Sequence, residues 1–280
     1  MNDRAPITLA YSPCPNDTYI FAALANGLLQ DVPAVRVHLE DIENLNNSAL
    51  KGDYEITKAS YGAIPLLMDQ YRILRAGGAL GRACGPLVVT RKECPTSLEN
   101  FRDGLVAIPG EMTTAFMLLR LAMGIRPQTI ALRFDRIVEA VASGSADAGL
   151  IIHESRFTYE EAGLVQVVDL GEWWESQTGL PIPLGAVLVR RDLDEVLVRS
   201  MHDAIVASLR FARANERAVM NYVREHAAEM QEEVVRKHID LYVNDFTEDI
   251  GEQGIAAVRE LFARAHAAGI IREQTEADFA

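Results

Sequence analysis

Short apolar runs alternate with helical patterns through the first two thirds of the chain. Runs rich in Val, Ile, Leu and aromatic residues predict strands at residues 7–11, 35–39, 55–59, 71–74, 86–90, 105–108, 131–134, 148–152 and 165–169. Apolar positions at helical spacing predict helices at residues 17–29, 43–51, 63–69, 114–123 and 137–143. Strands that alternate with helices form βαβ units, so we expect an α/β protein with mostly parallel sheets.

The pattern changes at residue 192. Helical periodicity with few β-branched runs predicts four helices, at residues 192–214, 216–228, 232–244 and 254–268. The polar tail after Ile271 is expected to fray.

Two Gly/Pro-rich stretches, residues 77–81 and 179–185, each lead into an apolar strand. If both stretches cross between domains, the middle of the chain is a domain inserted into the outer one. The expected outer lobe is then residues 1–88 with 190–280, and the inserted lobe is residues 89–189. This connectivity is that of two-lobed solute-binding folds, which place a ligand cleft between the lobes and a hinge at the crossings.

Composition narrows the function classes. The chain has 27 Lys and Arg against 40 Asp and Glu, a net charge of −13, which disfavours binding to nucleic acid or to an anionic membrane surface. No apolar run approaches the roughly 18 residues that span a bilayer, and no signal-like segment opens the sequence, so we expect a cytoplasmic protein. The three cysteines show no C-x-x-C spacing, so disulfides and a structural zinc site are not expected.

Small polar residues gather where predicted strands lead into helices. Helix N-termini carry free N–H groups and bind carboxylates and phosphates, which makes these turns candidate ligand contacts. The three turns contribute Ser12, Asn16 and Asp17, then Lys58, Ala59 and Ser60, then Thr113 and Thr114. Each turn also has a plainer interpretation, since such residues commonly serve only as helix caps, and Lys58 is either a ligand clamp or a solvated lysine.

His153 ends an apolar strand and is followed by charged and hydroxyl residues. An imidazole at this place is suited to act as a general base, although a structural hydrogen bond to a loop is also compatible with the pattern. We interpret His202, His226, His238 and His266 as surface residues because they lie on helices among charged neighbours. A Cys14–His153 nucleophile and base pair is a weaker alternative, and no metal-ligand spacing or nucleotide-binding motif occurs.

Several strings of residues are similar to one known family. They are S-P-C-P-N-D-T at residues 12–18, G-G-A-L-G-R at 77–82, G-P-L-V at 85–88, I-I-H-E-S-R-F-T-Y at 151–159, V-D-L-G at 168–171, W-W at 173–174 and T-G-L-P at 178–181. Together they resemble the 1,4-dihydroxy-6-naphthoate synthase family of menaquinone biosynthesis by the futalosine route, from residue 12 to about 244. Tyr19 stands where Phe is more usual.

The resemblance implies a two-lobed, periplasmic-binding-protein-like (type II) fold with the ligand cleft between the lobes. It implies a carbon–carbon lyase that converts a small-molecule substrate, cyclic dehypoxanthine futalosine, to 1,4-dihydroxy-6-naphthoate without metal or organic cofactor. It places the proton-accepting histidine at His153, and the substrate-contacting segments at Lys58, Ala59 and Ser60 and at Thr113 and Thr114.

Three other functions remain open at the level of sequence. A protein that only binds a small anion can have the same fold, because fold does not imply function. Chorismate dehydratase shares the fold and the pathway, although the S-P-C-P-N-D-T and H-E-S-R strings do not suit it. A ligand-sensing regulatory domain would need a DNA-binding module, for which this acidic chain has no basic patch. The oligomeric state is not predicted.

Overall fold

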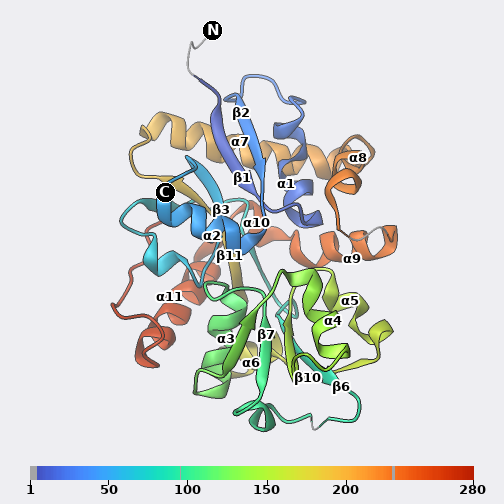
Figure 1. The fold of residues 1–280 in the computed structure, drawn as a ribbon. Coiled ribbons are helices and arrows are strands. Elements are labelled where there is room, and N and C mark those ends of the chain that lie inside the picture. The colour runs from blue at the N-terminus through green and yellow to red at the C-terminus, as the bar shows by residue number, and fades with distance from the viewer. Residues whose placement is uncertain (1–4, 95, 229–230) are drawn as a thin grey trace.

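Two β-sheets organise the chain in the computed structural model, which describes residues 5–94, 96–228 and 231–280 (Figure 1). The first sheet has the strand order β2-β1-β3-β11-β4, with β5 paired to β11. Its strands are β1 (Ile7–Tyr11), β2 (Val35–Leu39), β3 (Ile56–Ser60), β4 (Tyr71–Ile73), β5 (Ala79–Gly81) and β11 (Ile182–Arg190). The second sheet has the order β10-β6-β9-β7-β8. Its strands are β6 (Leu87–Arg91), β7 (Leu105–Ile108), β8 (Gln128–Ala131), β9 (Ala148–Ile151) and β10 (Leu164–Asp169).

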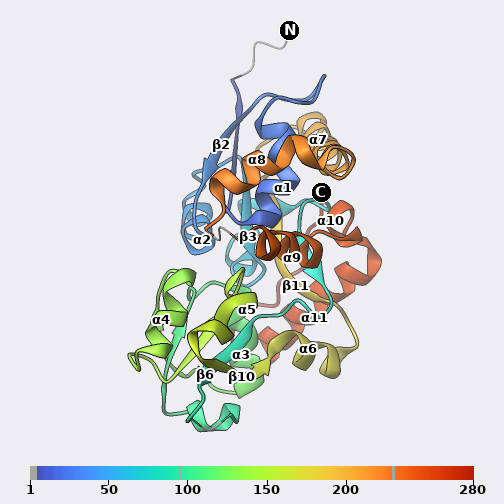
Figure 2. The same ribbon diagram turned by 90° about the vertical axis from the view of Figure 1, so that its right-hand side faces the viewer.

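Helices cover both sheets and form two groups. Around the first sheet lie α1 (Pro15–Ala25), α2 (Ile42–Lys51), α7 (Glu195–Ala214), α8 (Glu216–His226), α9 (Glu232–Tyr242), α10 (Asp245–Glu248) and α11 (Gly251–Ala267). Around the second lie α3 (Thr114–Met123), α4 (Ile137–Ala142), α5 (Ser155–Thr158) and α6 (Leu170–Thr178). Figure 2 shows α1, α7 and α8 packed together at one end of the molecule and α9 at the level where the two lobes meet. Among the described residues, none of the helices combines the length and the apolar character needed to cross a bilayer.

Both sheets are mixed rather than mostly parallel, which corrects the expectation from sequence. Strands β1, β2 and β3 run parallel, as do β7, β8 and β9. In contrast, β11 is antiparallel to β3, and β6 is antiparallel to β9. Each of these two strands follows a crossing from the other sheet and runs opposite to the parallel strand beside it.

The chain passes from the first sheet to the second between β5 and β6 and returns between α6 and β11. Leu87 and Val88 belong to the second sheet, because β6 pairs with β9. Residues 182–189 belong to the first sheet, because β11 pairs with β3. The predicted lobe boundaries at 88/89 and 189/190 therefore differ from the points at which the chain changes sheet. Whether the two lobes move relative to each other about the predicted boundaries stays a prediction.

Three further expectations need correction. The strand predicted at residues 131–134 lies earlier in the chain, because β8 is Gln128–Ala131 and a 3-10 segment follows at Phe134–Arg136. Within the predicted helix 63–69 only Ile64–Leu66 is helical, as a single 3-10 turn. Helix α6, which sequence reasoning missed, buries Trp174 completely, and its indole nitrogen donates to the carbonyl of Pro181 at 3.0 Å.

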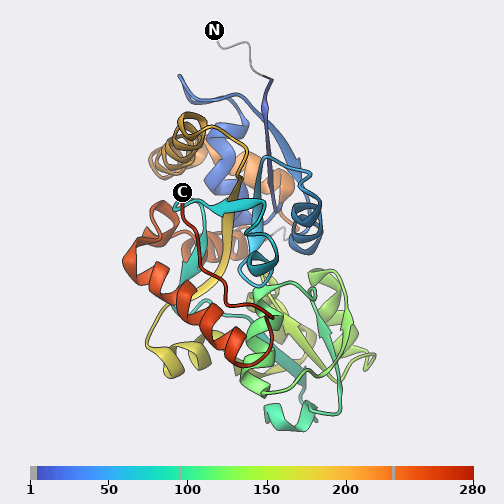
Figure 3. The same cartoon turned by 90° about the vertical axis from the view of Figure 1, so that its left-hand side faces the viewer.

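The polar C-terminal tail is docked rather than frayed. It runs back from α11 to the first sheet, as the dark red trace in Figure 3 shows. The amide of Ile73 donates to the carbonyl of Asp278 at 2.8 Å, and the amide of Ala280 donates to the carbonyl of Ile73 at 2.8 Å. Backbone hydrogen bonds to β4 therefore hold a segment that its composition alone marks as mobile.

Local chemistry sets the ends of the two helices that face each other between the lobes. Asp41 caps α2, its carboxylate accepting from the amide of Glu43, and Gly52 ends the helix at φ 72°. Thr113 caps α3 by accepting from the amide of Phe116, and Gly124 ends that helix at φ 66°. A left-handed residue after the last turn is the usual place for glycine.

Glu43 connects the two lobes. Its carboxylate, on α2 of the first lobe, accepts a hydrogen bond from the amide of Met112 at 3.1 Å, just before α3 of the second lobe. Gly110 allows this approach, because a Cβ added there would lie 2.3 Å from Cδ of Glu43. The carboxylate thus occupies the anion-binding position near the N-terminus of α3 and holds the lobes together.

Gly110→Ala and Glu43→Ala are expected to be coupled. The added methyl group collides with Glu43 and should lower the free energy of unfolding by roughly 1–3 kcal/mol. Truncation of Glu43 leaves a half-buried amide unpaired and should lower it by a similar amount. Because the shorter side chain in Glu43→Ala makes room for the methyl group, the double variant should lose less than the sum, by about 0.5–3 kcal/mol.

Urea denaturation of the four proteins measures this coupling, and small-angle X-ray scattering should show a larger radius of gyration for each single variant. Strictly additive losses with unchanged scattering would mean that Glu43 does not hold the lobes together.

Candidate active site

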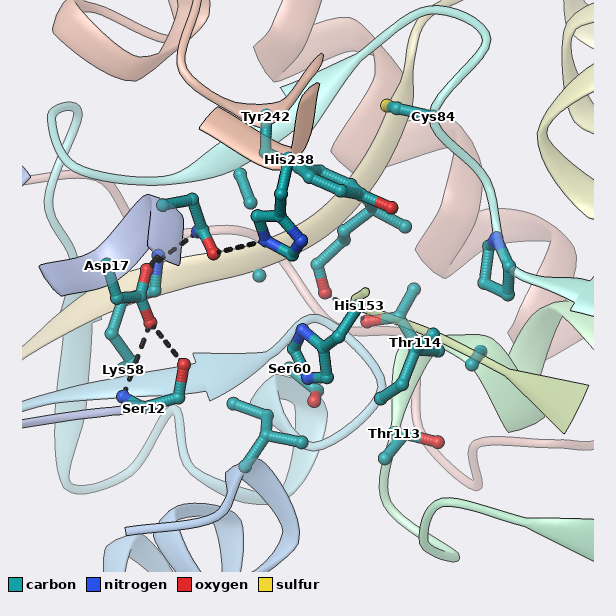
Figure 4. A pocket seen from close by; sticks show the side chains of 18 residues that line it. Ser12, Asp17, Lys58, Ser60, Cys84, Thr113, Thr114, His153, His238 and Tyr242 are labelled. Atoms are coloured by element: carbon teal, nitrogen blue, oxygen red, sulfur yellow. Dashed lines mark hydrogen bonds and ion pairs between the residues drawn. The ribbon is translucent and has the colours of Figure 1, made fainter. Parts of the chain in front are cut away.

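A cavity lies between the two sheets (Figure 4). Residues from both lobes and from helix α9 line it. They are Ser12, Asn16, Asp17, Ile42, Lys58, Ser60, Ala79, Cys84, Pro86, Thr113, Thr114, Ala115, Ile152, His153, Leu184, Gly185, His238 and Tyr242. All three predicted turns and the predicted histidine therefore meet in one place.

A buried ion pair forms one side of the cavity. The ammonium of Lys58 lies 2.9 Å from Oδ1 of Asp17, and both side chains are 3% exposed. The same ammonium donates to the carbonyl of Gly77 at 2.9 Å. The second oxygen of Asp17 accepts from the hydroxyl of Ser12 at 2.9 Å and from its amide. Lys58 is thus neither solvated nor free, and Asp17 is an ion-pair partner rather than the cap of α1, whose N-cap is Cys14.

Asn16 connects this ion pair to His238. Its side-chain NH2 donates to Oδ1 of Asp17 at 2.9 Å, and its oxygen lies 3.0 Å from Nε2 of His238. The expectation that His238 lies on the surface is wrong, since the residue is 1% exposed. The signal was present in the sequence, because Val235, His238 and Tyr242 share one buried face of α9 at helical spacing.

His153 lies opposite, just after β9. Its backbone has φ 57°, in the left-handed region, which is uncommon for a residue with a side chain and often marks a functional position. Its Nε2 is buried and makes no hydrogen bond within the described part of the chain. The ring of Phe134 packs edge-on against it at 4.9 Å. Burial lowers the pKa of His153 to about 4, with Asp17 opposing this shift and Lys58 adding to it.

The remaining predicted residues differ in what their side chains do. Ser60 accepts from the amide group of Asn46 at 3.2 Å, so its hydroxyl is held but can still donate. Thr113 is a helix cap, and the hydroxyl of Thr114 donates to the carbonyl of Leu184 in the other lobe. Ala59 lies in the core and does not line the cavity, because strand alternation points Lys58 and Ser60 toward the cavity and Ala59 away from it.

Cys14, His153 and Glu154 offer ligand atoms that lie within 4.8 Å of one another, the only group of this kind in the described ranges. Thiolate, imidazole and carboxylate groups can all bind Zn²⁺. Burial first, and the Glu154 carboxylate second, raise the pKa of the Cys14 thiol well above its ordinary value. The raised pKa disfavours the thiolate form and therefore a nucleophilic role for Cys14.

Comparison with known proteins identifies the family. A family model described as "Menaquinone biosynthesis" matches residues 7–267. The 1,4-dihydroxy-6-naphthoate synthase of Thermus thermophilus is 51% identical over 265 residues, covering 94% of this chain and 95% of the relative. The chain belongs to the 1,4-dihydroxy-6-naphthoate synthase family. The enzyme of that name from Streptomyces coelicolor is 45% identical over 270 residues, covering 95% of this chain and 94% of the relative.

Solved structures place this family member among two-lobed binding folds. A protein from Archaeoglobus fulgidus superimposes with a TM-score of 0.88 at 36% identity, over 95% of this chain and 98% of that one. The alkanesulfonate-binding protein of Xanthomonas axonopodis, bound to MOPS, superimposes with a TM-score of 0.76 at 11% identity, over 99% and 98%. The predicted periplasmic-binding-protein-like (type II) fold is confirmed. At 11% identity the likeness concerns the fold alone.

In this naphthoate synthase family member, Lys58→Met is expected to lower the free energy of unfolding by roughly 3–5 kcal/mol, because it leaves the Asp17 carboxylate buried without its cation. Adding Asp17→Asn should recover much of that loss, since the remaining groups are neutral. Lys51→Met, at an exposed site at the end of α2, is the matched control and should change stability by less than about 0.5 kcal/mol. Urea denaturation gives all four values, and equal losses at positions 51 and 58 would refute the importance of the ion pair.

Proposed function

We propose that the protein is a carbon–carbon lyase that converts cyclic dehypoxanthine futalosine to 1,4-dihydroxy-6-naphthoate in the futalosine route to menaquinone, with His153 as general base. Membership of the 1,4-dihydroxy-6-naphthoate synthase family supports the product and a role in menaquinone biosynthesis, and the futalosine substrate is part of the proposal. The observation that supports the base is the bare, buried Nε2 of His153 in the cavity between the lobes. An imidazole without a protein partner for one nitrogen is free to take a proton from a ligand.

The proposed reaction begins when His153 removes a proton from the bound substrate. The electron pair released forms a new double bond as the carbon–carbon bond to the sugar-derived fragment breaks. The electron pair of the broken bond passes into the ring system, which becomes aromatic, and the proton held by His153 returns to the product. Ser60 donates to the substrate carboxylate, with Lys58 and the backbone at Ala59 beside it. Thr113 and Thr114, whose hydroxyl groups already donate to the carbonyls of Gly110 and Leu184, accept from the ring hydroxyl groups. The lobes, held together by Glu43, keep water away from the base and fix its position.

Ser12, Asn16 and Asp17 enter this proposal through the ion pair rather than through direct contact. Their side-chain polar groups bind one another, Lys58 and His238. They shape the wall of the cavity and set the field at His153, where Asp17 raises and Lys58 lowers the pKa.

Two other functions are tested by the turnover measurement described below. A protein that only binds a small anion would retain the ligand unchanged, and a chorismate dehydratase would act on chorismate instead. A cytoplasmic location and a reaction without metal or organic cofactor stay predictions. The oligomeric state is not part of the proposal.

His153→Asn is expected to lower kcat by about 10²–10⁴-fold, the usual contribution of a general base. Asparagine is chosen because it tolerates the left-handed backbone at this position better than alanine does. Turnover is followed by mass spectrometry of cyclic dehypoxanthine futalosine and 1,4-dihydroxy-6-naphthoate. His266→Asn, at an exposed site on α11, is the matched control and should leave kcat unchanged.

Near-normal turnover of folded His153→Asn would exclude the base. No turnover by the unaltered protein, with binding retained, would favour the binding-protein function, and turnover of chorismate would favour the dehydratase. Cys14→Ala should keep its activity, whereas its complete loss in a folded protein would revive the nucleophile alternative.

The acid limb of kcat/KM is expected near pH 4 rather than near pH 6.5. The base acts only when it is neutral, and burial lowers the pKa of His153 to about 4, so activity should stay level from about pH 7 to 5 and fall below that. Burial also lowers the pKa of His238 well below its ordinary value, so this residue should add no limb near neutrality. Return of acid-treated enzyme to neutral pH separates protonation from unfolding. A limb centred near pH 6.5 in reversible enzyme would contradict the buried neutral base.

A further inference from the structure

His238 is a second buried histidine in the cavity that the proposed reaction does not use. It comes from α9, outside both sheets, and is 1% exposed. Its ring lies 6.1 Å from that of His153, with an angle of 21° between the two planes, and 4.6 Å from the ring of Tyr242. Figure 4 shows the two imidazoles above and below the same space.

Hydrogen bonds fix which nitrogen of His238 carries the proton. Asp17 accepts from the Lys58 ammonium on one oxygen and from the amide of Ser12 on the other, so its carboxylate acts as an acceptor. The atom of Asn16 that faces Asp17 must therefore be its NH2, and its oxygen must face His238. An oxygen requires a donor, so Nε2 of His238 carries the hydrogen.

The other nitrogen of His238 then has a bare lone pair. A neutral imidazole with its proton on Nε2 is an acceptor at Nδ1. Complete burial and the nearby His153 ring disfavour a second proton. Nδ1 is buried and has no hydrogen-bond partner in the ranges that the structure describes, and it is the ring nitrogen that does not face Asn16. Buried polar atoms are rarely left in this state, and a ligand group or an ordered water usually completes them.

We propose that Nδ1 of His238 accepts a hydrogen bond from a hydroxyl group of the substrate. Only a donor satisfies this atom, so His238 selects a hydroxyl and repels a carboxylate at this point of the cavity. The carboxylate of the ligand then lies away from Nδ1, toward the hydroxyl of Ser60, and the hydroxyl-bearing part lies toward α9. This assignment rests on the proposed function only for the identity of the ligand.

Two substitutions separate the acceptor from the link to Asn16. In His238→Gln the side-chain NH2 can replace Nε2–H and still donate to Asn16, while no acceptor remains at the place of Nδ1. In His238→Asn the shorter side chain can put its oxygen near the place of Nδ1 but loses the reach to Asn16. His266→Gln, at an exposed site, is the matched control.

Steady-state kinetics on cyclic dehypoxanthine futalosine should show kcat/KM of His238→Gln reduced roughly tenfold to hundredfold, as for an unpaired buried donor. His238→Asn should retain more of kcat/KM than His238→Gln does. The opposite order, or equal losses in two folded variants, would mean that the link to Asn16 is what matters, and would overturn the proposal.

A second measurement needs no substrate. Two-dimensional ¹H–¹⁵N spectra of the histidine side chains, with His238→Gln used for assignment, should show a bare Nδ1 and a protonated Nε2 at neutral pH. A protonated Nδ1 would overturn the proposal, whether or not the enzyme turns over its substrate.

The unaltered protein could show the expected tautomer, with a bare Nδ1, and yet no turnover. The proposed function would then fail, and binding of 1,4-dihydroxy-6-naphthoate, which carries hydroxyl groups, would test the acceptor separately. A shift of Nδ1 on its addition would support the acceptor, and no shift with binding retained would overturn it.

Discussion

The buried ion pair of Asp17 and Lys58 is the interaction on which the rest of the site depends. It joins the first turn of α1 to the middle of β3 and connects both to the loop at Gly77. Because each partner is almost fully excluded from water, every remaining polar atom around the pair must find a hydrogen bond. Ser12 and Asn16 meet that requirement, and Asn16 extends the network to His238 on α9.

An apolar pair of similar size would stabilise the fold at least as well, since taking two charges out of water is expensive. The ion pair instead fixes which atoms around it donate and which accept hydrogen bonds. A carboxylate that only accepts fixes the orientation of Asn16, and Asn16 fixes the tautomer of His238, so a charge at one wall of the cavity determines which atom faces the ligand at another. Apolar residues can fill the same space, but they make no hydrogen bonds and so cannot orient Asn16 or select the tautomer of His238.

Sequence identifies the site residues whose position follows from strand ends and misses those set by long-range packing. Ser60, Thr113 and His153 follow strands whose carboxyl ends meet at the cleft, so the pattern alone indicates them. Ala59 shows the limit of this reasoning, because a shift of one residue along a strand reverses the side to which it points. His238 was misread because its helix also carries charged residues, although its neighbours at helical spacing are apolar. The antiparallel entry of β6 and β11 depends on pairing between distant segments, which no local pattern encodes.

The low pKa of His153 is consistent with its proposed role once the ligand is considered. In the closed cavity Asp17 and Lys58 act on the imidazole in opposite directions, so burial decides its pKa. A ligand that carries a carboxylate adds a negative charge without a matching cation, and a nearby negative charge favours the imidazolium. The base therefore gains strength when the substrate is bound and stays neutral when it is absent.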